Sequence, residues 1–112
     1  MLTITSTTDP VLIPSDFKIE ITGITDADGT PQEVTSAEFF FHFYVNGYGP
    51  YTVSNEKNSV IENGKLYFVF QNYPFKAGGN LQYRQLTKCP DTAFSDGTQD
   101  VWTQGQTTII LK

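Results

Sequence analysis

Apolar and polar residues alternate along much of this chain, as they do in a β-strand with one buried face. The alternation is clear at residues 17–22 (FKIEIT) and 65–70 (KLYFVF), and no segment shows a helical repeat of useful length. Shorter or weaker strand patterns occur at residues 37–45, 51–53, 60–61, 80–87 and 107–111. The sequence therefore predicts an all-β domain of about seven to eight short antiparallel strands, folded as two sheets packed face to face.

Residues 37–45 (AEFFFHFYV) form the most aromatic of these segments. Because successive side chains of a strand point to opposite faces, one face carries Phe39, Phe41, Phe43 and Val45. The opposite face carries Phe40, His42 and Tyr44. A strand that is aromatic on both faces is expected to be central in its sheet, or to be covered by a partner.

Turn-forming residues separate the predicted strands. Asn63 and Gly64 give the strongest hairpin signal, and residues 89–99 are expected to form a long, turn-rich connection. A chain of 112 residues has room for one domain. We assign residues 16–112 to a single sandwich, and residues 1–15 either to a first strand or to an N-terminal arm that extends to a neighbour.

Charge and apolar content exclude several classes of partner. Twelve acidic residues against seven basic ones give a formal net charge of −5, which repels a phosphate backbone, so no nucleic acid partner is expected. No apolar stretch approaches the roughly 18 residues of a membrane-spanning helix, so no membrane partner is expected. Residues 1–14 lack the features of a signal peptide. The single cysteine, Cys89, excludes an internal disulfide bond.

Two residues invite a catalytic interpretation. His42 is the single histidine of the sequence, and a thiolate–imidazole pair between His42 and Cys89 would support nucleophilic catalysis. Neither residue lies in a recognised nucleophile motif, so the expected roles are a packed or interface imidazole and a small apolar thiol. The sequence therefore predicts no catalytic residue and no enzyme activity.

The spacing of Asp26, Asp28 and Gly29 resembles the start of a calcium-binding loop, where alternate carboxylates surround the cation. An EF-hand needs a glutamate at loop position twelve, and that position holds Ala37 here. Asp and Gly are also the residues that a turn between two strands prefers. We expect a turn, with no metal and no cofactor.

Several aromatic residues fall in predicted loops or strand ends. A set of exposed rings can form a platform on which a sugar stacks, and the candidates are Tyr48, Tyr51, Tyr73 and Trp102. The alternative is that these rings pack under loops or against a neighbouring subunit. Taken without any resemblance, the residues predict a β-sandwich without a visible active site.

The order of several motifs resembles one known family. Residues 16–22 (DFKIEIT), 26–31 (DADGTP) and 34–41 (VTSAEFFF) are similar to the N-terminal immunoglobulin-like domain of phage baseplate upper proteins. The likeness continues, over residues 16–111 in all, through residues 62–70, residues 77–83, Asp96, Gly97, Trp102 and residues 107–111. Departures are the strongly aromatic residues 39–44, and a Gly-Gly pair at residues 78–79 where the family has Pro-Gly.

The resemblance implies an immunoglobulin-like β-sandwich and a structural role. Domains of that family dock in rings on the distal tail of a virion and anchor fibres or receptor-binding proteins, and they bring no catalytic residues. The implied function is a non-enzymatic structural component of a phage or prophage tail or baseplate, located in the virion and assembled in the host bacterial cytoplasm. Its implied partners are other tail or baseplate proteins and further copies of itself. The alternative is a bacterial surface immunoglobulin-like binding module that binds carbohydrate.

Overall fold

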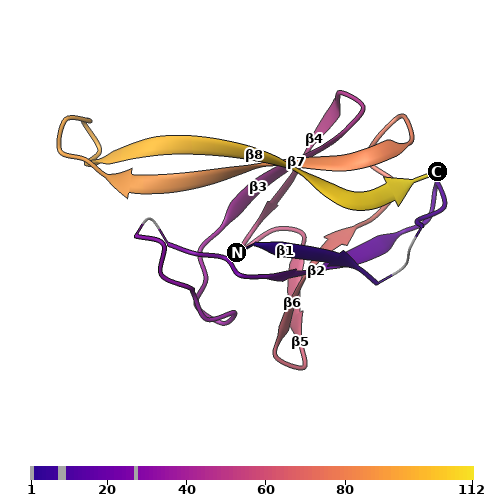
Figure 1. Ribbon diagram of the computed structural model, residues 1–112, viewed down its shortest axis with the longest axis horizontal. Helices are drawn as coiled ribbons and strands as arrows, with labels where there is room; N and C mark the ends of the chain where they lie inside the picture. Colours follow the sequence, from indigo (N-terminus) through magenta and orange to yellow (C-terminus); the bar gives the residue numbers. More distant parts are fainter. Residues whose placement is uncertain (1, 8–9, 27) are drawn as a thin grey trace.

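Eight antiparallel strands in two four-stranded sheets form a sandwich in the computed structural model, which describes residues 2–7, 10–26 and 28–112 (Figure 1). No helix occurs in these residues. The strands are β1 Thr3–Ser6, β2 Phe17–Thr22, β3 Phe40–Val45, β4 Tyr48–Ser54, β5 Ser59–Glu62, β6 Lys65–Phe70, β7 Gly79–Pro90 and β8 Thr98–Leu111. The all-β sandwich predicted from the alternation is confirmed.

The strand order is that of an immunoglobulin-like sandwich. The first sheet has the order β1-β2-β6-β5 and the second has the order β4-β3-β7-β8. This arrangement matches the two sheets of the constant-type immunoglobulin domain, with β4 as an extra strand beside β3. Strands adjacent in sequence form the hairpins β3–β4, β5–β6 and β7–β8, so the chain crosses between the sheets after β2, β4 and β6.

The core lies between the two sheets and consists largely of phenylalanine rings. Phe68 of β6 is fully buried, and its ring centroid lies 5.2 Å from those of Phe39 and Phe41 and 5.9 Å from that of Phe43. Other buried residues include Phe17, Ile19, Ile21, Val45, Val53, Leu66, Phe70, Phe75, Leu81, Ile109 and Leu111. β3 lies between β4 and β7, as expected for a strand that is aromatic on both faces.

The hairpin predicted at Asn63 and Gly64 is present. Both residues have positive φ angles, 53° and 75°, and they join β5 to β6 with Glu62 opposite Lys65. Two successive positive φ angles define the turn that matches the twist of paired strands. Asn and Gly adopt that conformation at little cost, which explains why this turn was visible in the sequence.

The N-terminal segment contacts both sheets. β1 pairs antiparallel with β2 in the first sheet, and Val11 then pairs in parallel with Leu111 of β8 in the second. Three backbone hydrogen bonds fix this second pairing: Val11 donates to Ile110 (3.1 Å), Lys112 donates to Val11 (2.9 Å) and Ile13 donates to Lys112 (2.7 Å). β1 is therefore the edge strand of the first sheet.

The last hairpin is longer than the sequence predicted. The closing strand was expected at residues 107–111, but β8 begins nine residues earlier, at Thr98. Strand pairing likewise extends through Pro90 into residues 89–99, which were expected to form a turn-rich connection. The residues concerned are mostly polar and show no regular alternation, so only cross-strand pairing defines this part of the strands.

The start of β3 was also placed too early. Residues 37–39 were predicted as strand, but β3 begins at Phe40. The amide of Asn55 hydrogen bonds to the Phe39 N–H (2.9 Å) and to the Ala37 carbonyl, so a side chain occupies the place of a neighbouring strand. β4 in turn includes Gly49, in a stretch that was expected to interrupt the strands.

Candidate binding surfaces

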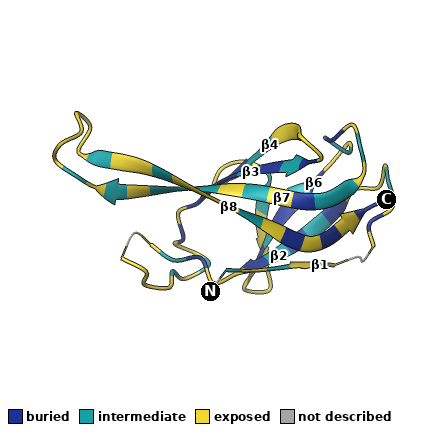
Figure 2. Ribbon diagram, turned by 45° about the horizontal axis from the view of Figure 1, so that its top comes forward, coloured by how far each residue is buried: buried dark blue, intermediate teal, exposed yellow. Residues whose placement is uncertain are grey.

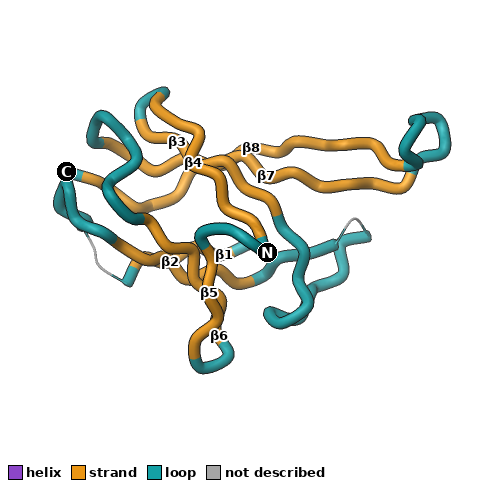
Figure 3. The backbone as a smooth tube through the Cα atoms, turned by 180° about the vertical axis from the view of Figure 1, so that it is seen from behind, coloured by secondary structure: helices purple, strands orange, loops and turns teal. Residues whose placement is uncertain are grey.

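The β7–β8 arm, residues 86–102, projects beyond the sandwich (Figures 1 and 3). It extends along the longest axis of the molecule, which measures 46 Å. The two strands stay paired from Leu86 opposite Trp102 to Pro90 opposite Thr98. None of the arm residues is buried, so the arm contributes nothing to the core (Figure 2).

The tip of the arm is closed by hydrogen bonds rather than by packing. The Asp91 carboxylate accepts the Ala93 N–H (2.9 Å), and the Asp96 carboxylate accepts the Thr98 N–H (3.1 Å). The second bond favours the ionised carboxylate and holds the pKa of Asp96 below its usual value. Phe94 lies in the turn with 45% of its surface exposed. The tip therefore presents an aromatic side chain on an ordered loop.

A second surface, the aromatic patch, lies on the outer face of the second sheet at the base of the arm. It consists of Phe40, His42 and Tyr44 of β3, Arg84 of β7 and Trp102 of β8. The strand alternation that buries Phe41 and Phe43 turns the three β3 side chains outward. The pairing of β3 with β7 sets His42 opposite Arg84, and the pairing of β7 with β8 brings Trp102 to the same region.

The rings of the patch contact one another. The Trp102 centroid lies 4.9 Å from that of His42 and 6.0 Å from that of Phe40, the latter in an edge-on geometry. The Arg84 guanidinium lies over Tyr44, 5.1 Å from the ring centroid, at a distance typical of a cation–π interaction. Partial burial, and then the charge of Arg84, lower the pKa of His42 below its usual value, which favours the neutral imidazole.

A shallow hollow of about 530 Å³ opens at the patch, lined by His42, Tyr44, Arg84, Trp102, Thr103 and Gln104. Among the described residues no carboxylate lines it, although the sequence carries twelve acidic residues. Arg84 takes part in none of the ion pairs among residues 2–7, 10–26 and 28–112. Trp102 is 45% exposed. The hollow therefore offers an accessible indole and a guanidinium without an acidic partner among the described residues.

The four aromatic residues considered for a sugar platform are not gathered in one place. The Tyr51 hydroxyl donates to the Val69 carbonyl (2.7 Å), and its ring stacks on Phe70 at 4.8 Å. The Tyr73 hydroxyl donates to the Ala77 carbonyl, and its ring packs against the core. Tyr51 and Tyr73 are thus packed inward. Tyr48 and Trp102 remain exposed, at 44% and 45%.

The neighbours of Trp102 in the patch were not proposed as binding residues from the sequence. The alternation did place Phe40, His42 and Tyr44 together on one face. The alternation did not predict the strand registers that bring Arg84 and Trp102 next to this face. The part of β8 around Trp102 shows no alternation from which its position could be predicted.

His42 and Cys89 do not form a pair. His42 lies opposite Arg84, and Cys89 lies five residues further along β7, about 17 Å at the rise of an extended strand. His42 instead contacts the rings of Phe40 and Trp102. Among the described residues, no group of three His, Cys, Asp or Glu side chains is placed to hold a metal ion.

The Asp26 carboxylate accepts hydrogen bonds from the turn in which it lies. The donors are the N–H groups of Asp28 (2.9 Å) and Thr30 (3.0 Å). Gly29 has a φ angle of 83°, which a glycine adopts without strain. This is the side-chain-to-backbone pattern by which an aspartate closes a loop.

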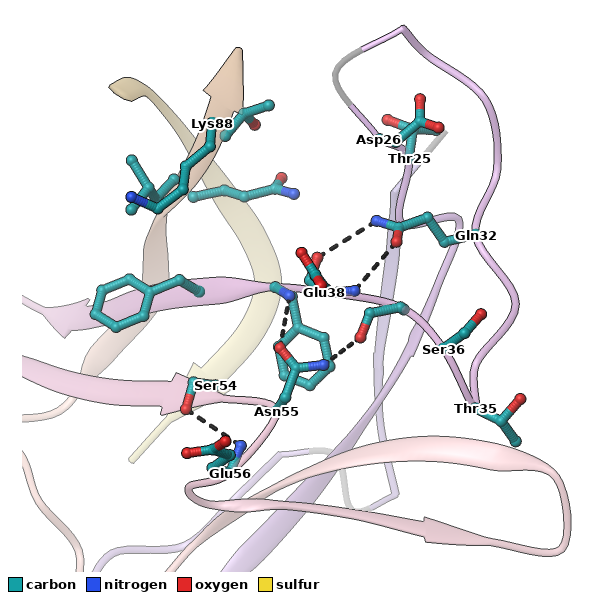
Figure 4. A pocket seen from close by; sticks show the side chains of 16 residues that line it. Thr25, Asp26, Gln32, Thr35, Ser36, Glu38, Ser54, Asn55, Glu56 and Lys88 are labelled. Carbon is teal, nitrogen blue, oxygen red and sulfur yellow. Dashed lines mark hydrogen bonds between the residues drawn. The ribbon is translucent and has the colours of Figure 1, made fainter. Parts of the chain in front are cut away.

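A polar groove of about 700 Å³ lies between the loop that precedes β3 and the base of the arm (Figure 4). Two amides in it bind the backbone of residues 37–39. The Gln32 amide accepts the Glu38 N–H (3.1 Å) and donates to the Glu38 carbonyl (3.3 Å), while Asn55 binds Ala37 and Phe39 from the other side. Both amides hold the backbone of residues 37–39 in place. We therefore assign the groove a structural role.

No protein-family model, no curated protein and no solved structure matches this chain. Within the part of the chain that the structure describes, no helix has the length and apolar character needed to span a membrane.

Proposed function

We propose that this chain is a non-enzymatic, immunoglobulin-like adaptor of a phage or prophage tail or baseplate, which assembles with other virion proteins and with copies of itself. The observation that carries the proposal is the β7–β8 arm. An ordered hairpin that buries none of its own residues adds no core stability, and it exposes Phe94 and Trp102. Such a hairpin is suited to contact another chain.

The free edge of β8 supports the same proposal. Among the described residues, the outer side of β8 is paired only at its C-terminal end, where Val11 lies opposite Leu111. Asp100 is the sole charged residue in Thr98–Leu111, and the strand contains no proline. Natural edge strands usually carry charges or prolines that prevent further pairing. The β8 edge lacks most of this protection and can accept a strand from a neighbour.

The test removes the arm and leaves the core. Replacing residues 87–101 by Asn-Gly joins Leu86 to Trp102, which are already paired, through a two-residue hairpin turn. Light scattering at micromolar concentration should show an oligomer for the full chain and a smaller species for the shortened chain, with a similar melting temperature. A full chain that stays monomeric, or a shortened chain of unchanged assembly, would contradict self-assembly through the arm.

The virion location needs its own test. Mass spectrometry of purified particles should detect the chain in the tail fraction. Particles that lack the chain would contradict the adaptor role, whatever its assembly in solution.

The aromatic patch favours a second candidate, a bacterial surface binding module for carbohydrate. An exposed indole beside polar side chains is the observation in its support. The two candidates rest on different parts of the molecule. The first depends on residues 87–101 of the arm, and the second depends on the patch, which includes Trp102 at the base of the arm.

A further inference from the structure

We infer that the aromatic patch is a binding site for a saccharide that carries a carboxylate, such as a uronic or sialic acid unit. This inference gives the second candidate function a ligand class. It rests on the patch alone, so it also holds for an assembly domain with a sugar-binding face.

Trp102 supplies the surface on which a sugar ring would stack. Trp102 is 45% exposed, and its indole contacts the rings of His42 and Phe40. A sugar ring has an apolar face of C–H groups, which the negative face of an indole attracts. Because its neighbours already hold the indole, little conformational freedom is lost on binding.

Arg84 supplies the charge preference. It is the sole arginine of the sequence, it lies over Tyr44, and no described acidic side chain pairs with it. A guanidinium binds a carboxylate through two parallel hydrogen bonds, which gives both strength and direction. No carboxylate from the described part of the chain lines the hollow, in a chain of net charge −5. An anionic group is therefore attracted to this hollow and repelled by the acidic surface elsewhere.

The remaining lining groups favour a saccharide over an acidic peptide. Thr103 and Gln104 contribute a hydroxyl and an amide, and His42 contributes an imidazole. These groups exchange hydrogen bonds with sugar hydroxyls and offer no apolar pocket for a peptide side chain. The hollow also lies on the face of the sheet, whereas an extended peptide would bind by pairing with a strand edge. Its volume of about 530 Å³ lies within the usual range for small-ligand sites.

Trp102 is the single tryptophan of the sequence, so its fluorescence reports directly on this site. The probes are trigalacturonate and 3′-sialyllactose, with galactotriose and lactose as the matched neutral sugars. We expect a saturable fluorescence change with at least one acidic probe, and an affinity at least tenfold weaker for its neutral counterpart.

Variants then assign the roles, with calorimetry as the common readout. Arg84→Gln should lower the affinity for the acidic probe at least tenfold, and Arg84→Lys should lower it less. Trp102→Ala should abolish binding of the probe. Lys88→Gln removes a cation outside the hollow, and Phe94→Ala removes an equally exposed ring at the arm tip. Both controls should bind like the unmodified chain.

Three results would overturn the inference. They are no binding of any of the four sugars, equal affinity for the acidic and neutral members of each pair, and unchanged binding by Arg84→Gln. Binding of hexaglutamate with the same dependence on Arg84, without binding of either acidic sugar, would assign the site to an acidic peptide instead. None of these outcomes depends on whether the arm-shortened chain assembles. The sugar-binding proposal and the assembly proposal can therefore be contradicted independently.

Discussion

Tyr83 of β7 lies directly across Gly105 of β8. The two residues are partners in the strand pairing, and a Cβ atom placed on Gly105 would lie 2.5 Å from the Cζ and hydroxyl oxygen of Tyr83. The Tyr83 ring also packs against Phe41 and Phe43, at centroid distances of 5.9 and 6.4 Å. Gly105 therefore makes room for a ring that covers the core where the arm begins.

Gly105→Ala should destabilise the fold by about 1–3 kcal/mol, because the Tyr83 ring has to move away from its core contacts. Urea denaturation measures the change. In a Tyr83→Ala background the same substitution should cost less, since the clash is gone. An equal cost in both backgrounds would show that backbone conformation, and not the ring, requires glycine at this position.

Phe68→Ala should cost about 3–5 kcal/mol, because it removes a fully buried ring that contacts both sheets. Phe94→Ala changes the same side chain at the exposed arm tip and should alter stability by no more than about 0.5 kcal/mol. Thermal and urea denaturation of the two variants provide the comparison. A large loss for Phe94→Ala would mean that the arm belongs to the cooperative core.

Asn55→Ala should cost about 1–3 kcal/mol, because it leaves the Phe39 N–H and the Ala37 carbonyl without partners beside the buried core. Gln32→Ala also removes two hydrogen bonds from a side-chain amide to the backbone. The backbone groups concerned belong to Glu38, which is exposed, so water can replace the lost partners. It should therefore cost less. Hydrogen exchange of the Phe39 amide should speed up in Asn55→Ala alone, and unchanged protection there would contradict the role given to Asn55.

His42 should make stability depend on pH near neutrality. Burial, and then Arg84, lower its pKa in the folded state, while the unfolded chain takes up a proton near pH 6.5. The unfolded state therefore binds more protons below that pH, so the free energy of unfolding falls as the pH drops from about 6.5 towards the folded-state pKa.

The His42→Gln variant is the control for this pH effect. It should lose the part of the pH dependence that begins near pH 6.5, whereas carboxylates titrate mainly around pH 4. Urea denaturation at constant ionic strength measures both proteins. A fall in stability of the same size in His42→Gln would assign the effect to other groups.

Burial made most of the fold predictable from the sequence. β2 and β6 were placed at their observed bounds because each alternates between the core and solvent, as Ile19 and Phe68 show. The Asn63–Gly64 turn was visible because its backbone conformation selects those two residues.

The parts that the sequence did not predict are held by pairing rather than by burial. The outer half of β8 has polar residues on both faces, and only its register with β7 defines it. The aromatic patch also depends on strand pairing, because Trp102 contacts His42 only when β3, β7 and β8 are paired. Residues 37–39 were misassigned for a related reason, since an amide of Asn55 stands where a strand was expected.

The parallel contact of Val11 with Leu111 has a mechanical consequence. The two segments run in the same direction, so a force that draws Val11 back towards β1 and Leu111 onward past Lys112 acts along the shared backbone contact. The three hydrogen bonds there carry such a load together, in shear, instead of opening one after another. The sandwich is therefore expected to resist stretching along this axis.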